Sequence, residues 1–174
     1  MKTVFFDVDT QIDFVYPAGA LYVPGAELIL PVIGELNRRA PVVISTMDAH
    51  AEDDPEFRIY PPHCVIGTTG QHKPAITLTD GQLTLEKQTL DCFSSPRLEP
   101  LLAQLNADRY VVYGVVTEIC VRFAAFGLLK TGKPVELVTD AVKALDERKA
   151  SDMFREFTAA GGRLTTSPAV LASL

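Results

Sequence analysis

Cys120 lies where a free thiol can become a nucleophile. The residues before it, Tyr110–Val116, are apolar and mostly β-branched, which predicts a buried strand of a parallel sheet. Thr117 suits the N-cap of a following helix, and Glu118 suits its first turn. The thiol would then lie above the carboxyl end of the strand, where unpaired N–H groups and the helix dipole favour the thiolate. A small buried hydrophobic residue is the alternative interpretation of Cys120.

Two other strand ends carry groups that can act on such a thiol. A first strand, Thr3–Val8, leads into Asp9, and a short strand over 83–87 ends at Lys87. Neighbouring strands lie about 4.8 Å apart, so Asp9 can serve Cys120 as a general base. Lys87, roughly 10 Å from the first strand, can reach between them and favour both anions. Each residue also has a simpler interpretation: Asp9 could cap a turn, and Lys87 could be a solvated surface charge.

A third set of residues has the composition of a metal site. Asp48 and His50 follow the strand over 41–47, and alternation along a strand directs their side chains the same way. His63 comes after a polar loop within residues 48–81, a segment without clear periodicity that is long enough to indicate a functional role. One carboxylate and two imidazoles suit one divalent ion, with zinc expected and iron or manganese as alternatives.

The elements that must position these groups alternate between strands and helices. Further strands are expected over 134–139 and 163–166, and helices over 27–39, 97–106, 146–160 and from 167 onward. This order predicts an α/β fold: a doubly wound, three-layer α/β/α, Rossmann-like architecture with a central six-stranded parallel sheet in the order 3-2-1-4-5-6. No glycine-rich phosphate-binding motif follows the first strand. Asp7, inside that strand, requires a buried partner that the sequence does not identify.

Composition limits the classes of function. The 174 residues suit a single domain, 1–174, and the net charge of −6 argues against nucleic-acid and anionic-membrane partners. The three Cys form no CxxC pair, which indicates a reducing compartment, with Cys64 and Cys92 as structural residues. No signal peptide or membrane-spanning run is recognisable. We therefore expect a cytoplasmic protein. Its expected partner is a small-molecule substrate, and we expect a homo-oligomer.

Separated segments of the chain match short patterns of one family in the right order. They are Asp9–Phe14 against D-x-Q-x-D-F, Gly19–Gly25 against G-A-L-x-V-P-G, Asp48–His50 against D-W-H, Pro62–Thr68 against H-C-V-x-G-T, and Gly114–Val121 against G-x-x-T-x-x-C-V. Lys87 stands where that family has its catalytic lysine. Together these segments resemble the isochorismatase-like cysteine hydrolases and, within them, the nicotinamidases.

The resemblance implies a catalytic triad of Asp9, Lys87 and Cys120. The acid takes the thiol proton, the thiolate attacks an amide carbonyl, ammonia leaves, and water hydrolyses the thioester. The resemblance also implies an oxyanion hole made by the backbone N–H groups of Val116 and Cys120, with a cis peptide bond between Val115 and Val116.

A metal on Asp48, His50 and His63 is implied as well, and in nicotinamidases it holds the pyridine nitrogen. The chain departs from the family pattern at the residues expected to contact the aromatic ring of the substrate. It has no Trp, and Ala49 replaces the Trp of D-W-H. The substrate contacts that we expect are Phe14, Tyr60 and Val115. The predicted function is a metal-assisted cysteine amidohydrolase for nicotinamide or a similar heteroaromatic carboxamide.

Three alternatives stay open from the sequence. A metal-free relative would act on isochorismate or a carbamoyl amide. A haloacid-dehalogenase-like phosphatase would use Asp7 as nucleophile and Asp9 as acid/base with magnesium, because residues 5–10 also fit its opening motif, although its later acidic motif is missing. A binding module that has lost turnover would not need the complete set of Asp9, Lys87 and Cys120.

Overall fold

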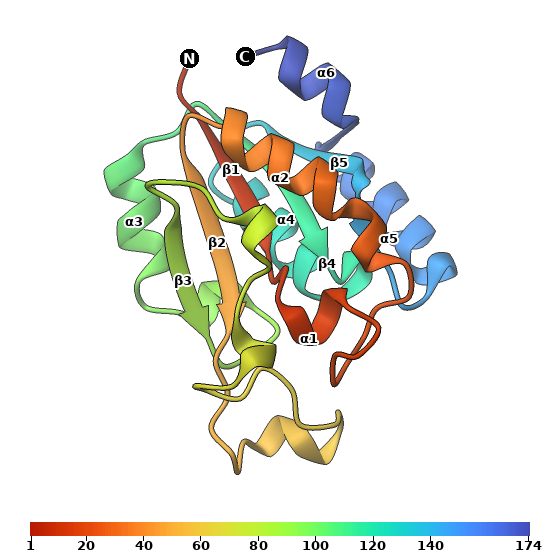
Figure 1. Cartoon of the computed structure of the whole chain (residues 1–174). Coiled ribbons are helices and arrows are strands. Elements are labelled where there is room, and N and C mark those ends of the chain that lie inside the picture. Colours follow the sequence, from red (N-terminus) through yellow and green to blue (C-terminus); the bar gives the residue numbers. More distant parts are fainter.

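A parallel sheet of six strands forms the middle layer of the computed structural model, which describes residues 1–174 (Figure 1). The strands are β1 (Thr3–Val8), β2 (Val43–Asp48), β3 (Leu83–Lys87), β4 (Arg109–Val115), β5 (Val135–Lys143) and β6 (Arg163–Thr165). Their order is β3-β2-β1-β4-β5-β6, and each neighbouring pair is parallel. The predicted architecture and strand order are confirmed.

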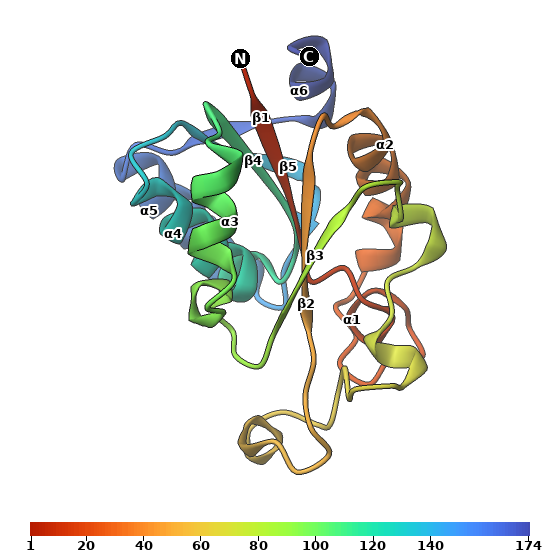
Figure 2. The ribbon, with the colours of Figure 1, turned by 90° about the vertical axis from the view of Figure 1, so that its left-hand side faces the viewer.

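Helices cover both faces of the sheet (Figure 2). α1 (Ile12–Val15) and α2 (Leu30–Arg39) lie on one face, and α3 (Leu98–Leu105), α4 (Arg122–Leu129) and α5 (Glu147–Ala159) lie on the other. α6 (Ser167–Ala172) packs against α2 and β5. The helix expected from residue 27 begins later, because Ala26–Ile29 forms a 3-10 turn before α2. None of the helices combines the length and the apolar character needed to cross a lipid bilayer.

The two central strands are buried along their whole length. Every residue of β1 and of β4 is buried, as expected for parallel strands covered by helices on both faces. Gly114 allows the two strand ends to approach closely: its φ is 118°, and a Cβ there would lie 2.1 Å from the carbonyl oxygen of Val8. Glycine is therefore required at this position, and it brings the end of β4 next to Asp9.

The segment between β2 and β3 folds as loops with three 3-10 turns, Pro55–Arg58, Thr69–Gln71 and Ala75–Thr77. Part of it projects beyond the carboxyl edge of the sheet, at the bottom of Figure 1. An isolated parallel bridge joins His50 to Val65 and anchors this projection to the end of β2. The segment thereby reaches the edge where ligands bind in open α/β sheets.

Candidate active site

Lys87, the last residue of β3, has its ammonium group among side chains from three other strand ends. Its Nζ lies 2.8 Å from Asp9 Oδ2, contacts Asp48 Oδ1, and donates a hydrogen bond of 3.9 Å to Cys120 Sγ. All four residues are at most 5 % exposed. The structure thus places the three residues of the predicted triad, together with one predicted metal ligand, in a single cluster.

Asp9 is fixed by its neighbour Thr46 on β2. The backbone of Asp9 is left-handed, with φ of 50°, and its N–H donates to the carbonyl oxygen of Thr46 at 3.1 Å. The hydroxyl of Thr46 donates to Asp9 Oδ1 at 2.6 Å. Oδ2, facing Lys87, is left as the oxygen that can accept a further proton.

Burial dominates the protonation of this cluster. It raises the pKa of the Cys120 thiol well above its ordinary value, although Lys87 opposes the shift. Burial also raises the pKa of Asp9, against the attraction of Lys87. For Lys87 burial lowers the pKa, but Asp9, Cys120 and Asp48 outweigh it and the pKa is raised overall. The start of a helix therefore does not by itself produce a thiolate here, and a base has to remove the proton.

The turn that carries Cys120 differs from the prediction. Thr117 is not an N-cap: Val116 is the extended residue before the turn, and no side chain caps it. Thr117–Val121 is a π-helical turn in which the N–H of Val121 donates to Val116 O at 3.1 Å, and α4 begins only at Arg122. The peptide bond between Val115 and Val116 is cis, as the resemblance implied. π-helical turns of this kind are frequent at functional sites.

Asp48, His50 and His63 form a second cluster beside the first. Asp48 Oδ2 lies 3.7 Å from His50 Nε2 and 3.8 Å from His63 Nε2. The three ligand atoms lie within 4.8 Å of one another and are buried. This spacing is suitable for a single ion bound by one carboxylate and two imidazoles.

The Nδ1 atoms of both imidazoles contact oxygen atoms outside this cluster. His50 Nδ1 contacts Asp54 Oδ2 at 2.9 Å, and His63 Nδ1 contacts the carbonyl oxygen of Pro61 at 2.8 Å. Both rings therefore direct Nε2 toward Asp48, the orientation that histidine ligands of metals usually have. His50 Nε2 is buried and has no hydrogen-bond partner, so the residues present fit a cation.

Sequence reasoning missed several residues of this site. Gln11 holds the backbone of Asp48: the N–H of Asp48 donates to Gln11 Oε1 at 2.7 Å, and Gln11 Nε2 donates to Asp48 O at 2.8 Å. Glu56 Oε1 lies 3.8 Å from His63 Nε2. Gln11 had a signal, its place in the D-x-Q-x-D-F segment, whereas Glu56 and Asp54 come from a polar loop without a periodic pattern.

The two clusters meet in one cavity. Phe14, Tyr60 and Val115, the expected substrate contacts, line it together with Asp48, Glu56, His63, Cys120, Val116, Leu21, Leu90, Ile119 and Leu145. Its volume is about 20 Å³, which is close to the space of one water molecule. An aromatic substrate can enter only when side chains at the mouth, such as the half-exposed Tyr60 and the exposed Leu145, move aside.

Comparison with known proteins identifies the family. The model of the isochorismatase domain matches residues 3–169. The chain belongs to the isochorismatase family. A nicotinamidase of Acinetobacter baylyi is 28 % identical over 172 residues, 80 % of each chain. A nicotinamidase of Escherichia coli is 26 % identical over 197 residues, covering 91 % of this chain and 92 % of that one.

Solved structures of the family agree with this assignment. A pyrazinamidase of Pyrococcus horikoshii in complex with zinc superposes with a TM-score of 0.89 and 29 % identity, over 95 % of this chain and 99 % of that chain. PnC1 from L. infantum in complex with nicotinate gives a TM-score of 0.89 and 30 % identity, over 97 % of this chain and 94 % of that chain. The protein is an amidohydrolase of the isochorismatase family, acting on amide C–N bonds.

The hydroxyl of Thr46 provides a first test of the cluster. In Thr46→Val, Asp9 Oδ1 loses its hydrogen bond, which raises the pKa of Asp9. We expect kcat/KM for amide hydrolysis to fall about tenfold, the size of effect expected when a charged group loses one hydrogen bond. The acidic limb of the pH profile of kcat/KM should move to higher pH, because Asp9 must be deprotonated to act as a base. A pH profile measures both effects. Thr46→Ser keeps the hydroxyl and should retain the normal profile; an unshifted limb in Thr46→Val would contradict this role.

Proposed function

We propose that the protein hydrolyses nicotinamide, or a similar heteroaromatic carboxamide, to the acid and ammonia through a thioester on Cys120. The observation that carries this proposal is one cavity lined by Cys120 from the triad and by Asp48 and His63 from the metal cluster. Lys87 joins the two groups, because it contacts Asp9, Asp48 and Cys120. Its support from relatives is that proteins named nicotinamidase and pyrazinamidase match most of the chain.

The reaction begins with proton transfer from Cys120 to Asp9. The thiolate attacks the amide carbonyl, and the backbone N–H groups of Val116 and Cys120 stabilise the oxyanion. Lys87 keeps negative charge favourable on both the acid and the sulfur. Asp9 then returns the proton to the leaving nitrogen, ammonia departs, and the same carboxylate activates the water that cleaves the thioester.

Asp48, His50 and His63 would hold one divalent ion, with zinc as the expected species. When bound, the ion supplies a Lewis acid that can accept the ring nitrogen of a pyridine. Phe14 and Tyr60 lie beside the same cluster: their ring centroids are 5.3 and 6.3 Å from that of His63. Aromatic side chains at this distance can pack against a flat ring and orient its carboxamide toward Cys120.

The experiment that tests the proposal is a substrate panel. Ammonia release is measured with nicotinamide, pyrazinamide and benzamide, which lacks a ring nitrogen, with and without a chelator. We expect nicotinamide and pyrazinamide to be hydrolysed and benzamide to be at least about tenfold slower, because it offers no ligand to the ion. Equal rates for benzamide would exclude ring-nitrogen recognition. Activity on a carbamoyl amide alone, unaffected by chelation, would instead favour a metal-free isochorismatase-like hydrolase.

Loss of one imidazole gives a prediction for the metal. In His63→Ala, bound zinc should fall from about one ion per chain to a small fraction, since three-ligand binding loses a ligand. KM for nicotinamide should rise more than about tenfold, while alkylation of Cys120 by iodoacetamide persists. Elemental analysis and steady-state kinetics measure these effects. His72→Ala, at the exposed third histidine, is the matched control; zinc retained in His63→Ala would contradict the ligand assignment.

A further inference from the structure

Leu145, in the loop between β5 and α5, lies at the mouth of the active-site cavity. Of the 12 residues that line this cavity, it is the one that is exposed, at 44 %. The cavity has a volume of about 20 Å³, whereas pockets for small organic ligands usually have roughly 300 Å³ or more. An aromatic amide therefore enters only if lining side chains move, and an exposed side chain moves against the least packing.

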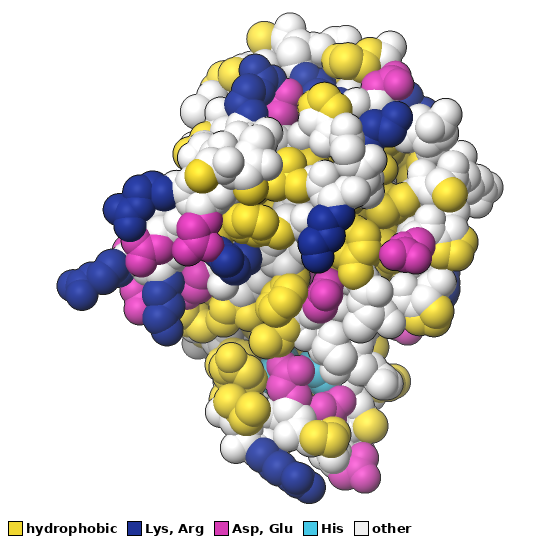
Figure 3. Space-filling view, turned by 180° about the vertical axis from the view of Figure 1, so that it is seen from behind, with side chains coloured by type: hydrophobic (Ala, Val, Ile, Leu, Met, Phe, Trp, Pro, Cys, Tyr) yellow, Lys and Arg dark blue, Asp and Glu magenta, His cyan; other side chains and the backbone are white.

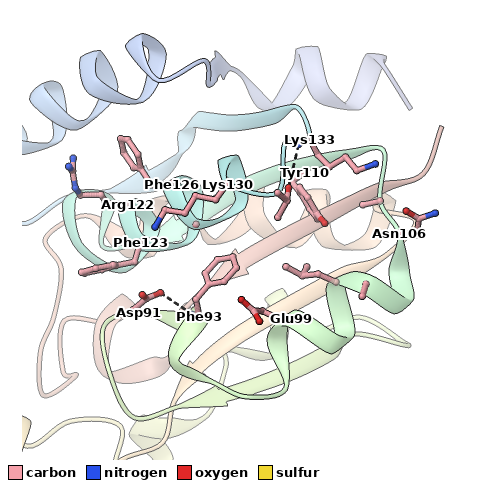
Figure 4. Close-up of a pocket in the computed structure, with 15 residues that line it drawn as sticks. Asp91, Phe93, Glu99, Asn106, Tyr110, Arg122, Phe123, Phe126, Lys130 and Lys133 are labelled. Carbon is pink, nitrogen blue, oxygen red and sulfur yellow. Dashed lines mark hydrogen bonds between the residues drawn. The ribbon is translucent and has the colours of Figure 1, made fainter.

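A larger cavity, between α3 and α4, is not an entrance to the active site (Figure 4). Phe93 from the loop after β3 and Phe126 from α4 are among its lining residues. None of the residues that line it also lines the active-site cavity. Access to Cys120 therefore depends on the mouth at which Leu145 lies.

Glu118, two residues before Cys120 in the π-helical turn, holds the backbone of the loop that carries Leu145. Its Oε1 accepts hydrogen bonds from the N–H groups of Leu145 at 3.0 Å and of Asp146 at 2.8 Å. Its Oε2 is buried and has no partner within the chain, so both hydrogen bonds of the carboxylate go to this loop. One side chain thereby joins the turn of the nucleophile to the mouth of the cavity.

The sheet keeps the same two segments adjacent. β4 and β5 are parallel neighbours, and Val115 pairs with Lys143 at their ends. Moving the loop away from the cavity would break the two hydrogen bonds to Glu118 or displace the turn that holds Cys120. Rotation of the Leu145 side chain requires neither, and exposed side chains change rotamer rapidly. The side chain is therefore the part that moves, on a backbone that stays fixed.

Exposure by itself would not assign a role to Leu145. Figure 3, which looks onto the α3–α5 face, shows hydrophobic side chains at several places between charged ones, as is usual on protein surfaces. Leu145 differs because it lines the active-site cavity and because its backbone is bound to the turn of the nucleophile. Leu78, which is 54 % exposed, has neither property and is the matched control residue.

We propose that Leu145 limits the size of the substrates that reach Cys120, and that Glu118 is the positioning residue that holds Leu145 at the mouth. The inference rests on the proposed function where it names the substrate class, which is amides of a single flat ring. Such a ring passes when the leucine side chain rotates, whereas a ring enlarged by a fused second ring is excluded by the fixed backbone. A steric difference of this kind discriminates by about tenfold or more.

Alkylation of Cys120 tests the size limit without amide turnover. The sulfur displaces iodide from iodoacetamide or from the bulkier iodoacetanilide, and mass spectrometry of the peptide that contains Cys120 gives both rate constants. Their ratio cancels changes in the reactivity of the thiol. Relative to free cysteine, the wild type should prefer iodoacetamide by at least about tenfold. Leu145→Ala should remove most of this preference and Leu78→Ala should retain it; a preference unchanged in Leu145→Ala would overturn the proposal.

Two variants of Glu118 test its positioning role. Glu118→Met removes the acceptor of both N–H groups, so the loop is released and the preference for iodoacetamide should fall as it does in Leu145→Ala. Glu118→Gln keeps an oxygen that can accept from the same N–H groups and should retain the wild-type preference. A wild-type preference in Glu118→Met would overturn the positioning role.

A pair of amides separates this inference from the proposed function. Quinoline-3-carboxamide is nicotinamide enlarged by a fused benzene ring. In Leu145→Ala, its kcat/KM relative to that of nicotinamide should rise at least about tenfold. If the wild type hydrolyses nicotinamide but neither ratio responds to Leu145→Ala, the size limit is wrong and the proposed function stands. If the alkylation ratio responds but no amide is hydrolysed, the role of Leu145 is supported and the proposed function is wrong.

Discussion

Replacing Cys120 with alanine is expected to reduce amide hydrolysis at least about 10⁴-fold while leaving the fold and the metal content unchanged. The thiol contacts the Asp9–Lys87 pair through the 3.9 Å hydrogen bond from Lys87 and lines the active-site cavity. No thioester can form without its sulfur, and water would have to attack the amide directly. Ammonia release under single-turnover conditions measures the loss. Mass spectrometry of quenched wild-type protein should detect the acyl adduct on Cys120.

The other two thiols supply the control for this experiment. Burial raises the pKa of Cys92 to about 12 and raises that of Cys64 further, and neither thiol contacts Lys87. Cys92→Ala should therefore keep turnover within about threefold of wild type, after correction for any loss of folded protein. Comparable turnover in Cys120→Ala and wild type would mean that the nucleophile lies elsewhere and that the proposed mechanism is wrong.

The sequence was sufficient to predict the meeting of Asp9, Lys87 and Cys120 because the carboxyl ends of parallel strands share one edge. Hydrophobic runs located the strands, and the chain order then fixed which ends are neighbours. The contact of Lys87 with Asp48 was not predicted. It joins the triad to the metal cluster, because the same ammonium group lies against the carboxylates of both.

The details that the sequence did not provide depend on tertiary contacts. Thr117 looked like an N-cap by residue type, but Val116 is the extended residue before the turn, and Thr117 is the first residue of the π-helical turn itself. The hydrogen bond of a π-helical turn spans one residue more than that of an α-helix, and the sequence pattern of hydrophobic side chains does not reveal this difference. Likewise, Glu56 reaches His63 only through the folding of a loop that has no hydrophobic period to reveal it.

Asp7 is the clearest case of a residue explained only by the structure. Its carboxylate is fully buried in β1, with Lys73 Nζ 2.9 Å from Oδ2, and it accepts hydrogen bonds from Thr10 Oγ1 at 2.6 Å and Asn37 Nδ2 at 2.8 Å. Lys73 comes from the loop segment between β2 and β3, whose position the sequence could not give. These partners satisfy the carboxylate inside the core, which argues against the phosphatase nucleophile that residues 5–10 suggested.

Removing the ammonium group from this pair should strongly destabilise the fold. In Lys73→Met the carboxylate of Asp7 remains buried without its countercharge, and we expect the free energy of unfolding to fall by about 3–5 kcal/mol. Urea unfolding monitored by circular dichroism measures the change. Arg155→Met breaks the exposed pair with Asp152 instead and should cost less than about 1 kcal/mol.

A second substitution separates the uncompensated charge from the lost packing of the lysine stem. Asp7→Asn in the Lys73→Met background removes the negative charge but keeps an oxygen that can accept from Thr10 or Asn37. If charge is the cause, the double variant should recover more than about half of the lost stability, since the buried ion is gone. A double variant as unstable as Lys73→Met would assign the loss to packing. In that case Lys73 would hold the loop segment against β1 through its aliphatic chain, with the Asp7 charge contributing little.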